Sequence, residues 1–238
     1  MKCDACNKPE TETNKLQKCS VCHASTYCSR ECQKSDFAAH KPACKKKGVL
    51  ALLTAIRDNN EAEVRRLMKT KYVLNGKVDY TLTDQEDADE LAEWTPLHEC
   101  IRMGRSDLLR ILVKGPGVKL EIKDGDGETP VFLGATSTDP LPLRVLLEAG
   151  ANPNTMARDG WTALMVAVRD GSYENTEALL EAGGDVNAGR DMFGRTCLDF
   201  AESMATGQTG IRMKGDETRE KAEERYRRIL ALLLSYQQ

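Results

Sequence analysis

The stretch from Cys3 to Cys44 reads CDACNKPETETNKLQKCSVCHASTYCSRECQKSDFAAHKPAC and contains four pairs of residues that can bind a metal ion. Two or three residues separate the members of each pair, so both side chains of a pair can reach the same ion from one turn. Zinc takes four Cys or His ligands in a tetrahedron. The pattern therefore predicts two zinc ions, each closed in by four protein ligands and each structural rather than catalytic. The pairs are Cys3 and Cys6, Cys19 and Cys22, Cys28 and Cys32, and His40 and Cys44.

Two other uses of these cysteines are less favoured. Residues Cys19 to His23 form the string C-x-x-C-H, which attaches c-type haem, but both cysteines fall on the metal-ligand register. Disulfide bonds are typical of secreted proteins, whose cysteines would be spread through the chain. Here seven of the nine cysteines lie in the first 44 residues, which favours zinc.

The full spacing, C-x2-C-x12-C-x2-C-x5-C-x3-C-x7-H-x3-C, resembles the MYND zinc finger at every ligand position. A RING-type ubiquitin ligase also uses eight ligands, but its His usually stands third or fourth rather than seventh. The MYND resemblance implies that the ligand pairs interleave as a cross-brace. One zinc would then take Cys3, Cys6, Cys28 and Cys32, and the other would take Cys19, Cys22, His40 and Cys44.

The same resemblance implies a groove that binds proline-containing peptides. The matching positions in this chain are Ser20, Gln33 and Phe37. The family usually has Trp in place of Phe37, and Phe lacks the indole N–H donor. Phe37 either lines this groove or packs the small core of the finger.

A second pattern repeats along the rest of the chain. A Thr followed by a small or Pro residue and then by an apolar residue recurs at steps of 34, 33 and 34 residues. Thr can cap the first turn of a helix, and Pro is tolerated there. A Leu further along is followed three residues later by Gly115, Gly150 or Gly183, which predicts a left-handed cap after each second helix. The repeated segments begin at Thr95, Thr129, Thr162 and Thr196.

The segment Thr95-Pro-Leu-His98 and the links at 149–154 and 182–187 resemble the ankyrin repeat. The resemblance implies a mainly α fold, with a small two-zinc cross-brace finger followed by an α-solenoid of ankyrin-type helix pairs. We expect the finger in residues 1–48 and about five repeats in residues 49–238, the first and last being atypical caps. In the last repeat we expect a first helix over Cys197–Ala205 and a long helix over Asp216–Tyr236, charged early and apolar late.

The residues of types that often carry catalysis are expected to be structural here. His98 occupies the position that the family uses for local hydrogen bonding, and neither Cys100 nor Cys197 has a His nearby in sequence. Asp124-Gly-Asp-Gly-Glu128 resembles the start of a calcium loop, but Ala135 stands where position twelve needs Glu. The repeat register predicts a hairpin turn for this stretch. Phosphate-binding loops and nucleophile elbows are not found in the sequence.

By the ankyrin resemblance, proteins bind at the hairpin tips and at the faces of the first helices. The variable positions just before each Thr are Trp94, Glu128, Trp161 and Arg195. Each Trp either binds a partner or covers the hairpin below it. The candidate partner-binding residues are Trp94, Arg102, Met103, Trp161 and Arg169.

Charge and hydropathy narrow the classes of partner. Residues 1–48 carry ten Lys and Arg against five Asp and Glu, a net +5, so the remainder of the −3 chain carries −8. This is not the basic footprint of a nucleic-acid binder. The sequence also lacks an apolar run of roughly 20 residues that could span a membrane and an apolar N-terminal signal. We expect an intracellular monomer, cytoplasmic or nuclear.

Together these features predict a non-enzymatic adaptor between proteins. Its finger would bind proline-containing peptides and its repeats would bind another protein. The alternative is a component of a ubiquitin ligase or of a chromatin or transcription regulator, in which the finger recruits the machinery. Relatives of the finger occur in lysine methyltransferases, but the catalytic SET domain would need sequence that the repeats already occupy.

Overall fold

The structure, a computed structural model, describes residues 1, 3, 10, 16–19, 26–27, 29–69, 71–77, 94–157, 159–207, 215 and 217–237. For residues 18, 26, 37–46, 71 and 72 it describes the backbone alone.

The N-terminal region joins two short strands to a long helix. β1 (Gln17–Lys18) and β2 (Thr26–Tyr27) pair in antiparallel register. α1 (Arg30–Arg57) then begins at Ser29, whose Oγ accepts a hydrogen bond of 3.2 Å from the backbone N–H of Cys32. The Tyr27 hydroxyl donates to Asp36 Oδ2 over 2.8 Å, which ties β2 to the first turns of α1. The boundary expected after residue 48 falls inside this helix, and its position as a domain boundary stays a prediction.

The other described helices are short, apart from α11. They are α2 (Glu61–Leu67), α3 (Lys71–Leu74), α4 (Pro96–Arg102), α5 (Ser106–Leu112), α6 (Pro130–Thr136), α7 (Leu141–Glu148), α8 (Ala163–Arg169), α9 (Tyr173–Glu181), α10 (Cys197–Ala205) and α11 (Arg219–Ser235).

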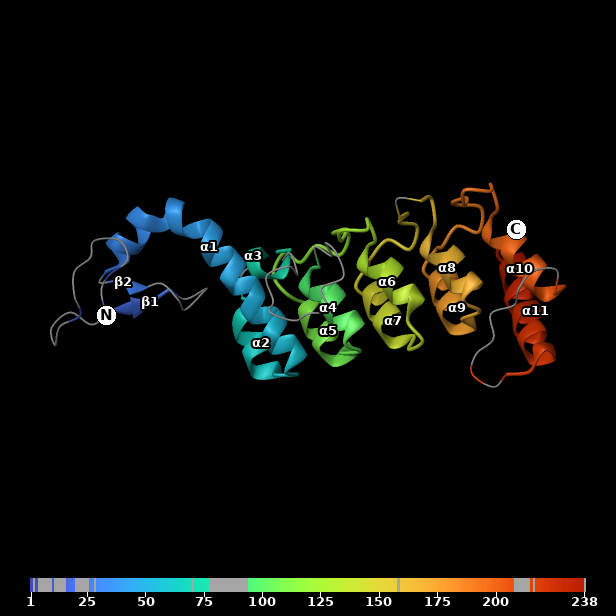
Figure 1. The fold of residues 1–238 in the computed structure, drawn as a ribbon, viewed down its shortest axis with the longest axis horizontal. Helices are drawn as coiled ribbons and strands as arrows, with labels where there is room; N and C mark the ends of the chain where they lie inside the picture. Colours follow the sequence, from blue (N-terminus) through green and yellow to red (C-terminus); the bar gives the residue numbers. More distant parts are fainter. Residues whose placement is uncertain are drawn as a thin grey trace.

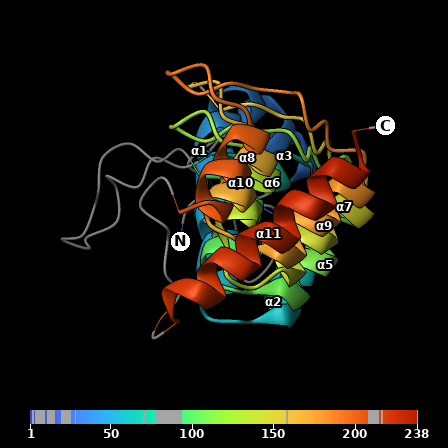
Figure 2. The same ribbon diagram turned by 90° about the vertical axis from the view of Figure 1, so that its right-hand side faces the viewer.

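These helices stack as pairs in two rows (Figure 1). The first helices α1, α4, α6, α8 and α10 contact one another in succession, and so do the second helices α2, α5, α7, α9 and α11. Figure 2, along the stack, shows the second helices on one side of the first ones, with α11 crossing the end obliquely. The predicted mainly α fold of stacked helix pairs is confirmed.

The Thr residues of the repeated pattern begin the first helices as expected. Thr129, Thr162 and Thr196 are N-caps, and each Oγ1 accepts a hydrogen bond from the backbone N–H three residues later, at 3.2–3.3 Å. In α4 the Nδ1 of His98 lies 2.8 Å from the Oγ1 of Thr95. Because an N-cap satisfies a backbone donor that the helix itself cannot, these residues fix where each repeat starts.

The predicted left-handed caps are found after two of three second helices. Gly150 and Gly183 have φ of +86° and +88°, but Gly115 is not among the left-handed residues, so its predicted role is wrong. α5 ends at Leu112, and the left-handed position comes later, at Gly117. Gly115 instead allows close packing, because a Cβ there would lie 2.6 Å from Cδ1 of Leu74.

One apolar core runs along the stack between the two rows. It includes residues from Leu52 in α1 to Leu233 in α11. Leu97, Val131 and Leu164, which hold the same place in successive first helices, are all buried in it. Each repeat therefore buries apolar surface between its own two helices and against its neighbours, as expected for a solenoid. In the described ranges, no helix combines the length and the apolar character needed to span a membrane.

Candidate functional site

Thiol groups from separate segments meet in the N-terminal region. Cys3 and Cys19 are buried at 0% and 3% exposure, together with Tyr27, and Cys32 packs against this cluster from the first turn of α1. Thiolate sulfur is a preferred zinc ligand, so the residues present fit the metal. The other five predicted ligands (Cys6, Cys22, Cys28, His40 and Cys44) lie outside the described residues or have undescribed side chains. Which ligands share an ion stays a prediction.

Only one of the three predicted groove residues can be placed. Gln33 is half-exposed on α1, one residue after Cys32. Ser20 and the side chain of Phe37 lie outside the described part of the chain. The groove at Ser20, Gln33 and Phe37 therefore also stays a prediction.

The predicted partner-binding residues of the repeats come together as two equivalent pairs. Trp94 precedes the N-cap of α4, and Arg102 at the end of this helix lies with its Cζ 5.5 Å from the Trp94 ring centroid. Trp161 and Arg169 of α8 repeat the arrangement at 5.0 Å. All four side chains remain partly exposed, as does Met103 at the C-cap of α4. Each pair is a cation–π contact that presents an aromatic group and a guanidinium on one face.

A buried carboxylate anchors the first of these pairs. Glu99 of α4 has a fully buried side chain, and its Oε1 accepts from Arg57 Nε at 2.8 Å and from Arg102 Nη2 at 2.9 Å. Arg57 is the last residue of α1. Glu99 therefore holds Arg102 over Trp94 and joins α1 to the next first helix.

Glu99 and Phe200 are not among the site residues that the sequence predicts, although the position that they share in the repeat is informative. Both stand four residues after the repeated Thr, where the other repeats have Leu133 and Val166. A charged residue in an apolar column predicts a buried ion pair, and Glu99 has one. Phe200 packs on Trp161 with ring centroids 5.0 Å apart. Trp161 therefore covers part of the following repeat and is also partly exposed.

The possible nucleophiles of the repeats are buried. Cys100 and Cys197 are both 0% exposed. Burial, and then the charge of Glu99, hold the pKa of the Cys100 thiol far above its usual range, and burial raises the pKa of Cys197 to about 12. Such thiols stay protonated at neutral pH, whereas the thiolate is the reactive form.

His98 has the structural role that the sequence predicts. Its ring is fully buried, with Nδ1 near the Oγ1 of Thr95 and Nε2 3.2 Å from the backbone carbonyl oxygen of Glu128. Burial lowers its pKa, so the ring is neutral at pH 7. It thereby links α4 to the following hairpin.

The stretch from Asp124 to Glu128 is the hairpin turn that the repeat register predicts. Asp124 is buried, and its Oδ1 accepts from the backbone N–H groups of Asp126 and Glu128 at 3.0 and 2.9 Å. Glu128 itself is half-buried. Its burial, and then the charges of Asp124, Asp126 and Asp159, raise the pKa of its carboxyl to about 7, against a smaller opposing effect of Arg169.

Replacing Glu128 with Gln is expected to change how stability depends on pH. Between the unfolded pKa of about 4.5 and the folded pKa of about 7, the unfolded chain releases its proton first. Glu128 therefore lowers the stability of the wild type as pH rises through this window, with no further change above it. Urea unfolding should show equal midpoints for the two proteins below the window and a higher midpoint for Glu128→Gln above it.

The difference between the urea midpoints of the two proteins cancels the contributions of the other groups that titrate in this range. His98 is one of them, and its contribution has the opposite sign because burial lowers its pKa. A difference that stays constant across the window would show that the Glu128 carboxyl does not titrate there.

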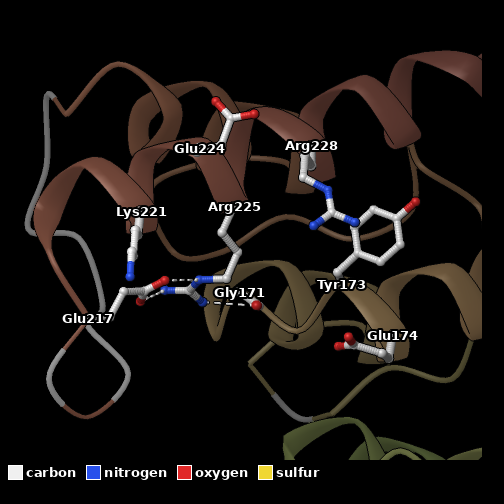
Figure 3. Close-up of a pocket in the computed structure, with 8 residues that line it drawn as sticks. All are labelled: Gly171, Tyr173, Glu174, Glu217, Lys221, Glu224, Arg225 and Arg228. Atoms are coloured by element: carbon white, nitrogen blue, oxygen red, sulfur yellow. Dashed lines mark hydrogen bonds and ion pairs between the residues drawn. The ribbon is translucent and has the colours of Figure 1, made fainter.

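A cleft of about 370 Å³ between α9 and α11 (Figure 3) is a structural joint rather than a ligand site. Arg225 of α11 pairs with Glu217 at 3.0 Å and donates to the carbonyl oxygens of Asp170 and Gly171. Of the other charged residues early in α11, Arg219, Glu220, Lys221 and Glu224 are exposed and Glu223 is partly buried. The six charged residues of the cleft are three acids and three bases, which favour no ion of one sign: Glu174, Glu217, Lys221, Glu224, Arg225 and Arg228.

Comparison with protein families bears on both regions. The model of the MYND finger matches residues 3–44. A model of a single ankyrin repeat matches residues 93–122, and a model of three ankyrin repeats matches residues 116–190. The helix pairs α1/α2 and α10/α11 lie outside the ankyrin matches.

Individual relatives are similar to the chain over parts of their length. Human B-cell lymphoma 3 protein is 36% identical over 112 residues, which are 45% of this chain and 24% of that protein. Rat ankyrin repeat and SAM domain-containing protein 6 is 32% identical over 125 residues, 52% of this chain and 14% of that protein. Ankyrin repeat-containing protein P1E11.10 of Schizosaccharomyces pombe is 27% identical over 66% of this chain and 78% of that protein. The chain thus spans less than a quarter of the first two relatives.

Proposed function

The chain joins a MYND finger at residues 3–44 to ankyrin repeats at residues 93–190, and from this architecture we propose that it is a non-enzymatic adaptor between proteins. The finger, folded around two structural zinc ions, binds proline-containing peptides at Ser20, Gln33 and Phe37. The repeats bind a second protein on the face that carries Trp94 and Trp161. The adaptor acts as a monomer inside the cell, in the cytoplasm or the nucleus.

The observation that carries the proposal is the pair of equivalent Trp–Arg contacts. Trp94 with Arg102 and Trp161 with Arg169 lie in the same place on two repeats and stay partly exposed. Trp and Arg are the residue types that dominate the binding energy of protein interfaces. The guanidiniums are also held in place before binding, by Glu99 and by Asp170 at 2.8–2.9 Å, which reduces the entropy lost on association.

The proposal that the adaptor is not an enzyme is supported by the burial of the residues that could carry catalysis in the repeats. His98, Cys100 and Cys197 are each 0% exposed and have the structural contacts described above. None of them can meet a substrate without unfolding of its repeat.

Selection of a random displayed peptide library on the full chain tests the proposal. We expect two groups of binders, one rich in proline and lost when a zinc chelator is added, and one that survives the chelator. The second group should bind Trp94→Ala/Trp161→Ala roughly tenfold or more weakly. Circular dichroism should show that this variant keeps its helices.

Two results would refute the adaptor. One is a selection that enriches no peptide on the repeats. The other is a surviving group of binders that the double variant retains with unchanged affinity.

A further inference from the structure

Five side chains of the last two repeats form an uninterrupted stack. Arg169 lies over Trp161 at 5.0 Å, Trp161 lies 5.0 Å from Phe200, and Arg195 lies 4.4 Å from the Phe200 centroid and 5.2 Å from the Phe193 centroid. We call this set, with the adjacent Met192, the C-terminal stack. Cation–π and ring–ring contacts of this kind fix the orientation of every member.

The stack ends in an apolar tip on the last hairpin. Met192 and Phe193 are 84% and 74% exposed, and they are among the most exposed large apolar side chains of the described residues. The two preceding hairpins have polar or small residues at the corresponding places, with Asp126 and Asp159 equivalent to Phe193. Solvated apolar side chains gain free energy when a partner covers them.

The tip is held rigidly by Asp191. Its Oδ1 accepts from the backbone N–H groups of Phe193 and Arg195, both at 2.9 Å. Its Oδ2 accepts from Nε and Nη2 of Arg195 at 2.9 and 2.7 Å. These four bonds order the turn before any partner arrives, which lowers the entropy cost of binding.

Within the stack, the guanidinium groups are more exposed than the carboxylates that pair with them. The side chains of Arg195 and Arg169 are 42% and 35% exposed, whereas their carboxylate partners Asp191 and Asp170 are 2% and 19% exposed. A carboxylate from outside would therefore meet the guanidiniums before it met the acids beneath them. Arginine in such a position binds carboxylates in a paired, planar geometry.

We propose that the C-terminal stack docks an acidic protein segment that carries an apolar side chain. The apolar side chain packs on Met192 and Phe193, and a neighbouring carboxylate binds Arg195 or Arg169. A polynucleotide is disfavoured because residues 49–238 carry a net charge of −8 (24 Lys and Arg against 32 Asp and Glu). This inference rests on the proposed function and names the class of partner for the repeats.

The test uses the peptides of the library selection that survive the zinc chelator. We expect their enriched sequences to place Asp or Glu close to an apolar residue. We expect Met192→Ser/Phe193→Ser to bind them roughly tenfold or more weakly, and added salt to weaken the wild-type complex. Both replaced side chains are exposed, so the urea midpoint should stay unchanged.

Met156→Ser is the matched control, because Met156 is a 49% exposed apolar residue in the preceding hairpin. It should bind the same peptides as the wild type does. Peptides that lack acidic residues, or that the tip variant binds normally, would overturn the inference but leave the adaptor in place. Displacement of the peptides by a single-stranded oligonucleotide at low concentration would instead point to nucleic acid as the partner. A selection without any repeat-binding peptide would overturn both proposals.

Discussion

Replacing Glu99 with Ala is expected to lower the free energy of unfolding of the repeats by about 3 kcal/mol, the lower end of the range for breaking a buried ion pair. The carboxylate is fully buried and accepts hydrogen bonds from two arginines on different helices. Its loss removes the counter-charge that Arg57 and Arg102 share, so the two guanidiniums then repel each other. Both arginines keep some solvent contact, at 24% and 42% exposure, so water relieves part of the repulsion.

Two companion variants separate charge from packing. Arg102→Ala should cost about 1 kcal/mol or less, because Arg102 is the more exposed partner and Arg57 still pairs with Glu99. Glu99→Gln keeps the shape and some hydrogen bonding, so it should fall between the two. The measurement is urea unfolding at neutral pH, followed by circular dichroism. If Glu99→Ala unfolded at the same urea concentration as Arg102→Ala does, the carboxylate would not join α1 to α4.

Removing zinc is expected to have the largest effect on the N-terminal region. Structural zinc contributes on the order of 10–16 kcal/mol per site to the folding of finger peptides, and the described core of this region is small, with Cys3, Cys19 and Tyr27 at its centre. A chelator should therefore unfold residues up to about 48. The C-terminal half of α1 should stay folded, because Leu52 and Ile56 belong to the core of the repeats.

Hydrogen exchange read by mass spectrometry can resolve these two halves. After chelation we expect exchange to become fast in peptides from the first half of α1 and to stay slow in residues 49–57. Zinc content gives a second readout: Cys19→Ser should lose one of two ions per chain, and Cys100→Ser should lose none. Slow exchange throughout α1 after complete metal removal would mean that zinc does not fold this region.

The sequence predicts the register of the repeats well because the signals are local. The Thr caps act within one helical turn, and α10 begins and ends at the residues expected, Cys197 and Ala205. The caps at Gly150 and Gly183 likewise depend only on the helix that each of them ends. The prediction for Gly115 is wrong because the role of this residue depends on Leu74, which is far away in the chain.

The continuous α1 shows why the domain boundary is harder to place. The end expected for the finger falls at Gly48, yet this residue lies buried inside the helix. A single glycine costs a helix only about 1 kcal/mol, and the flanking residues compensate. The net charge of the chain changes sign after residue 48, but no helix ends there.

The candidate site on the repeats is only partly predictable, for a related reason. The Trp and Arg positions follow from the register. The stack on Phe200 and the anchoring by Glu99 and Asp191 depend on contacts between helices and hairpins that periodicity does not specify. A comparison of the residues at the same position in successive repeats singles out Glu99 and Phe200 as exceptions, but it does not say what they contact.

The most direct test of the adaptor is whether one chain binds both classes of peptide at the same time. The chain is first saturated with a proline-containing peptide from the chelator-sensitive group, and an acidic peptide from the surviving group is then titrated into it by calorimetry. We predict that the acidic peptide binds with one site per chain and with the affinity that it has for the peptide-free chain. Displacement of the first peptide by the second would mean that the finger and the repeats do not offer separate surfaces, and it would contradict the adaptor.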